Sequence, residues 1–167
     1  MSRIRALLIA AAWCGSMLAQ AADPAPATVA PPPAYGPAIA LAEARTCVAA
    51  AQAEAARNQW FMVVTVVDAG GHEVLTERMD NTQFGSLLPA AQKARTAVSF
   101  RRPTKVFEDM VAQGGAAMRI LRLDELIPID GGLPLLRGGA IIGGVGVSGG
   151  TAQQDGVVAA ACVAALD

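Results

Sequence analysis

The sequence is poor in the residues that usually mark a specialised binding chemistry. Its 167 residues include one histidine and three cysteines, only 4% are aromatic, and basic and acidic residues nearly balance at a net charge of −1. So small a charge argues against a nucleic-acid partner. No pair of histidines or cysteines has the spacing of a zinc site, and there is no C-x-x-C pair for haem attachment. An apolar content of 53% supports one packed domain.

The N-terminal residues 1–21 have the pattern of a secretory signal peptide. Two arginines precede an apolar run over residues 6–18, and residues 19–21 (Ala-Gln-Ala) form a small-x-small cleavage site. The run is shorter than a membrane-spanning helix requires, so we expect an exported protein, periplasmic or secreted, with no stable membrane insertion. Residues 22–37 are predicted to be a proline-rich linker. The folded domain is expected over residues 38–167.

Hydrophobic periodicity and turn residues predict the elements of this domain. Helices are expected over residues 41–58, 86–100, 104–113 and 151–166, and hairpins pair residues 60–67 with 72–79 and 133–137 with 140–148. Glycines occupy both hairpin turns, at 70–71 and 138–139. The prediction is an α+β domain in which helices cover an antiparallel sheet.

Two cysteines of the expected domain, Cys47 and Cys162, fall in its first and last predicted helices. In an oxidising compartment they are suited to a disulfide that joins these helices. Two buried, unbonded cysteines in alanine-rich helices fit the sequence equally well. The sequence leaves both states open.

A glycine-rich segment over residues 144–150 fits two enzyme motifs. Its G-x-G-x-x-G pattern is that of a dinucleotide site, but it follows a hairpin rather than a parallel strand. Its G-x-S-x-G pattern would make Ser148 a nucleophile with His72 as the base, although the order of these residues differs from that of α/β-hydrolases. We favour a packing role, in which the glycines let a strand pass close beneath a helix of small residues.

Polar side chains gather in two places along the chain. Arg78 and Asp80 end the first hairpin, while Lys93 and Thr96 stand three residues apart and share one face of a predicted helix. If this face turns towards Asp80, the result is a pocket with paired charges. A purely structural ion pair between Asp80 and Lys93 is the alternative.

The single histidine, His72, follows the first hairpin turn and is expected to be exposed. A turn histidine is commonly just solvated, but imidazole is also a usual axial ligand of haem iron. The other soft or weak ligands of this kind are Met62, Met79, Met110, Met118 and Tyr35.

Five ordered motifs resemble the GlcG/HbpS family, the haem-degrading-domain superfamily, over residues 41–166. They are Val66-Val67-Asp68 with Gly71, Arg78-Met79-Asp80, Lys93-Ala94-Arg95-Thr96-Ala97, Gly131-Gly132-Leu133-Pro134, and residues 143–149 with Asp155. The chain departs from the commoner pattern of that family at Asn81, where glycine is usual, and at Arg95.

The resemblance implies a sandwich with helices on both faces of the sheet and assembly into dimers or larger homo-oligomers. Exported members of the family resemble haem-binding proteins that sequester haem and promote its oxidative breakdown. By resemblance, the ligand pocket would be formed by Arg78, Asp80, Lys93, Thr96, Gly132 and Pro134. Thr96 would offer an oxygen contact to haem, and His72 is the candidate nitrogen ligand of its iron.

We therefore expect an exported small-molecule-binding protein whose ligand is haem, with sequestration or oxidative degradation as its role. One alternative is an enzyme that acts on a small organic acid through Asp80, Lys93 and Ser148. Another is an oligomeric interaction protein without a ligand. No catalytic residue is assigned from the sequence, and whether the protein is an enzyme stays open.

Overall fold

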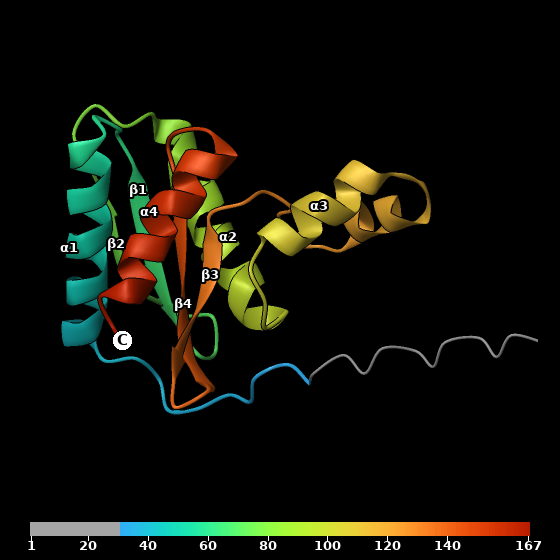
Figure 1. Ribbon diagram of the computed structural model, residues 1–167, viewed down its shortest axis with the longest axis horizontal. Coiled ribbons are helices and arrows are strands. Elements are labelled where there is room, and N and C mark those ends of the chain that lie inside the picture. Colours follow the sequence, from blue (N-terminus) through green and yellow to red (C-terminus); the bar gives the residue numbers. More distant parts are fainter. Residues whose placement is uncertain (1–30) are drawn as a thin grey trace, which may run out of the picture. The chain divides into compact units, whose positions relative to one another are not determined.

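The computed structural model describes residues 31–167, in which the elements follow the predicted order (Figure 1). The signal peptide predicted over residues 1–21 lies outside the described residues, as does most of the predicted linker. The elements are α1 (Leu41–Arg57), β1 (Val63–Asp68), β2 (Glu73–Arg78), η1 (Phe84–Ser86), α2 (Leu87–Ser99), α3 (Lys105–Gln113), η2 (Gly115–Arg122), β3 (Gly132–Arg137), β4 (Ala140–Ser148) and α4 (Ala152–Ala164).

The four strands form one antiparallel sheet in the order β2-β1-β4-β3. The long central strand β4 pairs with β1 on one side and with its hairpin partner β3 on the other. Helices α1 and α4 pack together on one face of the sheet, and α2 covers the opposite face (Figure 1). This confirms the predicted α+β fold with helices on both faces. Among residues 31–167, no helix is long and apolar enough to cross a membrane.

The main core lies between the sheet and the pair α1 and α4. Alternate residues of β1 and β4 point into it, namely Val64 and Val66, and Val145 and Val147. The α1 face that meets them carries mostly alanine, for example Ala44 and Ala51, so the helix lies close to its neighbours.

A disulfide between Cys47 and Cys162 joins α1 to α4 within this core. Both residues are fully buried, and their Cα atoms are 4.2 Å apart. The bond closes a loop over a sequence separation of 115 residues, which spans nearly the whole domain. Of the two states left open by the sequence, the structure has the bonded one.

Helix α2 lies unusually close to the other face of the sheet because glycines face it. Gly144 and Gly146 alternate with the core valines of β4, and a Cβ atom on Gly146 would collide with the backbone oxygen of Ala90. A Cβ atom on Gly144 would lie 2.8 Å from the backbone oxygen of Ala94. The packing role expected for the glycine-rich segment is thus what the structure shows.

The chain that enters the domain extends the sheet beside β4. Beyond the end of β1, Tyr35 forms a parallel bridge with Ile141, and the Gly36 N–H donates to the Ile141 oxygen at 2.7 Å. The Ile39 N–H donates to the oxygen of Ile142 at 2.8 Å. The last residues of the segment predicted as a linker therefore take part in the pairing of the sheet.

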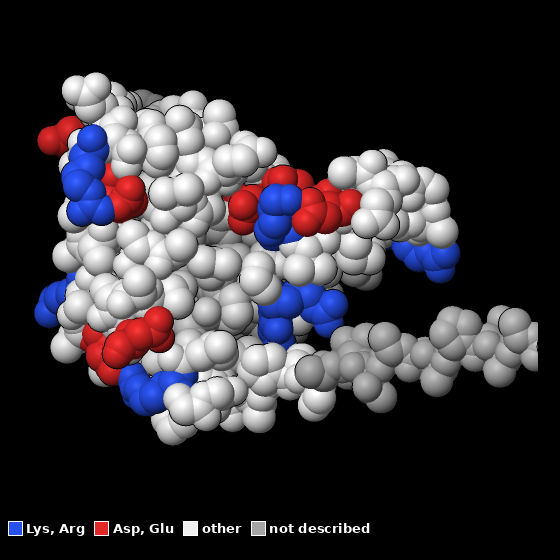
Figure 2. Space-filling view, in the orientation of Figure 1, with Lys and Arg blue, Asp and Glu red and all other residues white. Residues whose placement is uncertain are grey.

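Residues 104–131 leave the sheet as an arm built from α3, η2 and the returning chain (Figure 1). Its base is closed where the Thr104 N–H donates to the Gly132 oxygen and the Gly132 N–H donates to the Thr104 hydroxyl, both at 2.9 Å. Around α3, Lys105 pairs with Glu108 and Asp109, a charged cluster visible in Figure 2. The arm also exposes five apolar side chains: Val106, Met118, Leu121, Leu123 and Ile129.

Candidate functional site

Lys93 and Asp155 form a buried ion pair between α2 and the first turn of α4. The Lys93 Nζ lies 2.6 Å from Asp155 Oδ2 and donates to the Val147 backbone oxygen at 3.0 Å, and the two side chains are 2% and 4% exposed. The second carboxylate oxygen of Asp155 accepts from the Gly150 N–H at 3.0 Å. The lysine is thus enclosed and engaged, and its partner is Asp155 instead of Asp80.

Thr96, on the same helix, holds the returning chain of the arm. Its hydroxyl donates to the Glu125 oxygen at 3.1 Å and accepts from the Ile127 N–H at 3.1 Å. The residue is 1% exposed. Because both hydrogen-bonding directions of the hydroxyl are used inside the protein, Thr96 acts here as an anchor for residues 125–127.

The Gly131 to Pro134 segment lies against Lys93, as the sequence hypothesis expects. A Cβ atom on Gly131 would meet Lys93 Nζ at 3.0 Å, and one on Gly132 would meet the Lys93 backbone oxygen at 2.5 Å. Pro134 follows in β3, opposite Gly144. The segment and α2 are therefore in close contact.

Asp130, which directly precedes Gly131, has a carboxyl group whose pKa is raised. Its partial burial raises the pKa of its carboxyl, the hydrogen bond from the Gly131 N–H opposes this, and the nearby Glu108 carboxylate adds to the rise. The cations Lys105 and Lys93 lower the pKa, but the net direction is upward. Asp130 is thus a group whose charged form the fold disfavours.

Arg78 and Asp80 lie elsewhere, at the end of β2. Arg78 donates to the Thr82 backbone oxygen at 3.2 Å, and its guanidinium carbon lies 4.7 Å from the centre of the Phe84 ring. Both Arg78 and Asp80 are exposed. The sequence-predicted set therefore falls into a buried group around Lys93 and an exposed pair at this edge.

His72 stands in the β1–β2 turn, at the opposite end of β2 from Arg78. Its side chain is 83% exposed, and its Nδ1 lies 3.3 Å from Asp68 Oδ1. Burial opposes the charge of Asp68, but hydrogen bonds from the N–H groups of His72 and Gly70, with the imidazole beside them, hold its pKa below the ordinary value. Since β2 has six residues, His72 lies about 20 Å from the other end of the strand.

The hydrolase motif does not assemble into a catalytic group. Ser148 ends β4 opposite Val63, the first residue of β1, while His72 lies in the turn after the other end of β1. The serine and the histidine thus lie at opposite ends of the sheet. Among residues 31–167, no three His, Cys, Asp or Glu side chains are grouped to hold a metal ion.

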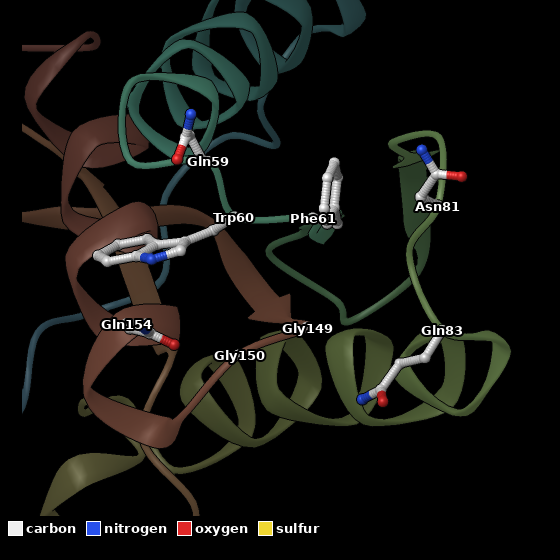
Figure 3. Close-up of a pocket in the computed structure, with 8 residues that line it drawn as sticks. All are labelled: Gln59, Trp60, Phe61, Asn81, Gln83, Gly149, Gly150 and Gln154. Atoms are coloured by element: carbon white, nitrogen blue, oxygen red, sulfur yellow. The ribbon is translucent and has the colours of Figure 1, made fainter.

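A hollow of about 280 Å³ opens where α1 ends, β1 begins and α4 begins (Figure 3). Gly149 and Gly150 line it where β4 ends, and the half-exposed Phe61 ring lies between Gln59 and Asn81 in Figure 3. Amide side chains form much of the remaining wall. The full lining is Gln59, Trp60, Phe61, Asn81, Gln83, Gly149, Gly150 and Gln154.

A second, more apolar hollow of about 570 Å³ adjoins the first and shares three of its residues. It is lined by Ala56, Gln59, Trp60, Phe61 and Met79. Its volume lies in the usual range of small-molecule sites, and its mixture of aromatic and aliphatic surface with a single thioether is suited to a large planar apolar ligand.

The sequence hypothesis missed most of these lining residues. The sequence predicts a strand that starts at Trp60, but β1 begins at Val63, so Trp60 and Phe61 belong to the loop that precedes it. Two adjacent aromatics in a chain with 4% aromatic residues were a usable signal. Asn81, which stands where the family usually has glycine, lines the hollow of about 280 Å³, the amide-rich hollow.

Comparison with known proteins gives matches that span nearly the whole described domain. Residues 39–164 match the family model described as HbpS-like haem degrading protein. The protein GlcG of Escherichia coli K12 is 42% identical over 105 residues, which cover 63% of this chain and 77% of that protein.

Solved structures share the fold. The crystal structure of a double mutant of HbpS from Streptomyces reticuli aligns with a TM-score of 0.73 and 30% identity over 86% of this chain and 99% of that chain. The crystal structure of a PduOC–haem complex aligns with a TM-score of 0.71 and 33% identity, over 78% of this chain and 96% of that chain.

Proposed function

Because the chain belongs to the HbpS-like haem degrading protein family, we propose that it is an exported haem-binding protein that sequesters haem or promotes its oxidative breakdown. The observation that carries the proposal is the similarity to PduOC, which was crystallised with haem. The alignment covers 96% of that chain at 33% identity, so it extends well beyond the sharing of a fold.

The hollow of about 570 Å³, the apolar hollow, fits the chemistry of haem. A porphyrin needs a concave apolar surface, and the walls formed by Ala56, Trp60 and Phe61 provide one of about 570 Å³. Met79 lines the same hollow with a thioether, a known axial ligand of haem iron.

In this arrangement the protein's part is to hold and orient the group. The aromatic side chains of Trp60 and Phe61 would shield the bound group from water, and Met79 would hold its iron. Bound haem would supply a redox-active iron. The exposed His72 belongs to a second arrangement, in which haem binds at the β1–β2 turn, because His72 and Met79 lie at opposite ends of β2.

The proposal places the mature protein in the periplasm or outside the cell. The buried disulfide between Cys47 and Cys162 supports this localisation, since such bonds persist in oxidising compartments. We further propose a homo-oligomer. Exposed apolar side chains on the arm, among them Met118, Leu121 and Leu123, support it because surfaces of this kind favour protein contacts.

The test is an absorbance titration of hemin into the purified protein, with Met79→Leu and His72→Ala as the two ligand variants. We expect a saturable Soret shift whose affinity falls at least about tenfold in Met79→Leu and is unchanged in His72→Ala. Met110→Leu, a matched change in α3, is the control and should behave as the original protein. Loss of the shift in His72→Ala alone would move the site to the turn, and a featureless titration of the original protein would remove haem binding altogether.

A further inference from the structure

The amide-rich hollow has a polar lining without charge. Among its lining residues are four amide side chains, Gln59, Asn81, Gln83 and Gln154, and none of its eight lining residues is ionisable. These amides come from three separate parts of the chain, the end of α1, the loop between β2 and η1, and the start of α4, and Figure 3 shows Gln59 and Asn81 on either side of the Phe61 ring. A charged ligand would have to give up water here without meeting an opposite charge, which is unfavourable.

Three N–H groups beside the hollow, at the start of α4, are already engaged within the protein. The Gly150 N–H already donates to Asp155, the Thr151 N–H donates to Gln154 Oε1 at 2.9 Å, and the Gln154 N–H donates to the Thr151 hydroxyl at 3.3 Å. These N–H groups, which would otherwise attract an anion, are satisfied within the protein.

The amides, by contrast, retain capacity for a ligand. Gln83 uses its Nε2 group on the Ser86 hydroxyl and keeps its oxygen, while Gln154 uses its oxygen on Thr151 and keeps its Nε2 group. Within the described part of the chain, the side chains of Gln59 and Asn81 make no hydrogen bond to another residue. The hollow therefore offers donors and acceptors in comparable number.

Two of these amides occupy backbone positions that favour glycine. Gln59 has φ 59° and Asn81 has φ 64°, both in the left-handed region. Gln59 directly follows the C-cap of α1, where glycine is the common choice. At such a position the long side chain of Gln59 is unfavourable for the backbone alone, whereas asparagine adopts it more readily than most residues, and strained residues such as Gln59 tend to cluster at ligand sites.

From these observations we infer that the amide-rich hollow is a binding site for a small uncharged polyhydroxylated molecule, such as a monosaccharide or sugar alcohol. Each hydroxyl of such a ligand both donates and accepts, which matches the amides, and its C–H face suits the half-exposed ring of Phe61. The volume of about 280 Å³ is near the lower end for ligand pockets and so selects a small molecule. Although the two hollows share Gln59, Trp60 and Phe61, this inference rests on the amide lining and not on the proposed haem binding.

The experiment is an NMR titration of the haem-free protein that follows the side-chain NH₂ signals of Gln59 and Asn81. The probes are D-glucose and sorbitol, with gluconate as a charged molecule of the same carbon skeleton. We expect saturable shifts of these signals with at least one neutral probe and binding at least about tenfold weaker for gluconate. No saturable shift with either neutral probe, or equal binding of gluconate, would overturn the inference.

Glycine variants separate binding from folding. Asn81→Gly removes a pocket amide at a position whose backbone suits glycine, so the fold is retained while affinity for the neutral probe falls about tenfold. Glu125→Gly is the matched control, because Glu125 is also left-handed (φ 65°) but lies outside the lining, and its affinity should not change. Undiminished affinity in Asn81→Gly contradicts the assignment.

The haem proposal can fail separately. Met79 lines the apolar hollow but is not among the residues that line the amide-rich one, so Met79→Leu should weaken hemin binding and leave the sugar-induced shifts intact. Sugar-induced shifts without hemin binding would remove the proposed function alone. Hemin binding without sugar-induced shifts would remove this inference alone.

Discussion

Removal of the Lys93 charge is expected to destabilise the fold strongly. In Lys93→Met the side-chain volume is nearly kept, but Asp155 stays buried at 4% exposure without its partner at 2.6 Å. Breaking a buried pair in this way costs about 3–5 kcal/mol, because the remaining charge is uncompensated. The Val147 oxygen also loses its donor. A domain of ordinary stability, about 5–15 kcal/mol, would lose a large part of it.

A double-mutant cycle isolates the pair. Asp155→Asn leaves an oxygen for the Gly150 N–H but strands the Lys93 charge, so it should also cost about 3–5 kcal/mol. In the double variant both charges are gone, and the loss should be far below the sum of the two single losses. We expect a coupling energy of at least about 2 kcal/mol, measured by urea denaturation of the four proteins.

The opposite result has a clear meaning. The result that would refute this reasoning is a free energy of unfolding of Lys93→Met within about 1 kcal/mol of that of the original protein, together with weaker hemin binding. In that case Lys93 contacts the ligand, as the sequence predicts, and is not a structural ion-pair partner. Circular dichroism of each variant under native conditions provides the control that the denaturation curves start from the folded state.

Two further predictions concern the disulfide and the arm. In the Cys47→Ala/Cys162→Ala variant the free energy of unfolding should fall by about 5 kcal/mol, the chain-entropy value for a loop spanning 115 residues, and Tm by about 20 °C. The original protein after reduction should melt like the variant. Equal Tm values for the oxidised original protein and the variant would contradict this prediction. Asp130→Asn should raise stability at neutral pH. The pKa of Asp130 is raised in the folded protein, so the fold is most stable when this carboxyl is protonated and loses stability as the pH rises through that pKa. The stability advantage of Asp130→Asn should therefore shrink as the pH falls. A difference in denaturation midpoint between the variant and the original protein that stays constant with pH would contradict this prediction.

The fold was largely readable from local sequence signals. The paired glycines 138 and 139 both have positive φ, which is the backbone that a two-residue hairpin turn requires. Thr151 and Gln154 form a reciprocal cap at the start of α4, so the helix begins where the sequence predicts. Such signals act within a few residues, and the alternation of valine and glycine in β4 fixed which face meets which helix.

The site depended on contacts between distant residues. Lys93 and Asp155 are 62 positions apart, and nothing local to Lys93 distinguishes this partner from Asp80. Thr96 shares a helix face with Lys93, as predicted, but the returning arm occupies its hydroxyl. The buried roles of these residues follow from the packing of α2 against the glycines of the sheet.

By itself, the sequence determined the order of helices and strands and the α+β class, because periodicity, caps and turns are properties of short segments, and its five motifs indicated the family by resemblance. The tertiary structure alone decided that Cys47 and Cys162 are bonded, that Lys93 is enclosed, and that Gln59 and Asn81 face one hollow. The physical reason is that burial, ion pairing and pocket shape depend on distances between elements, which local patterns do not specify.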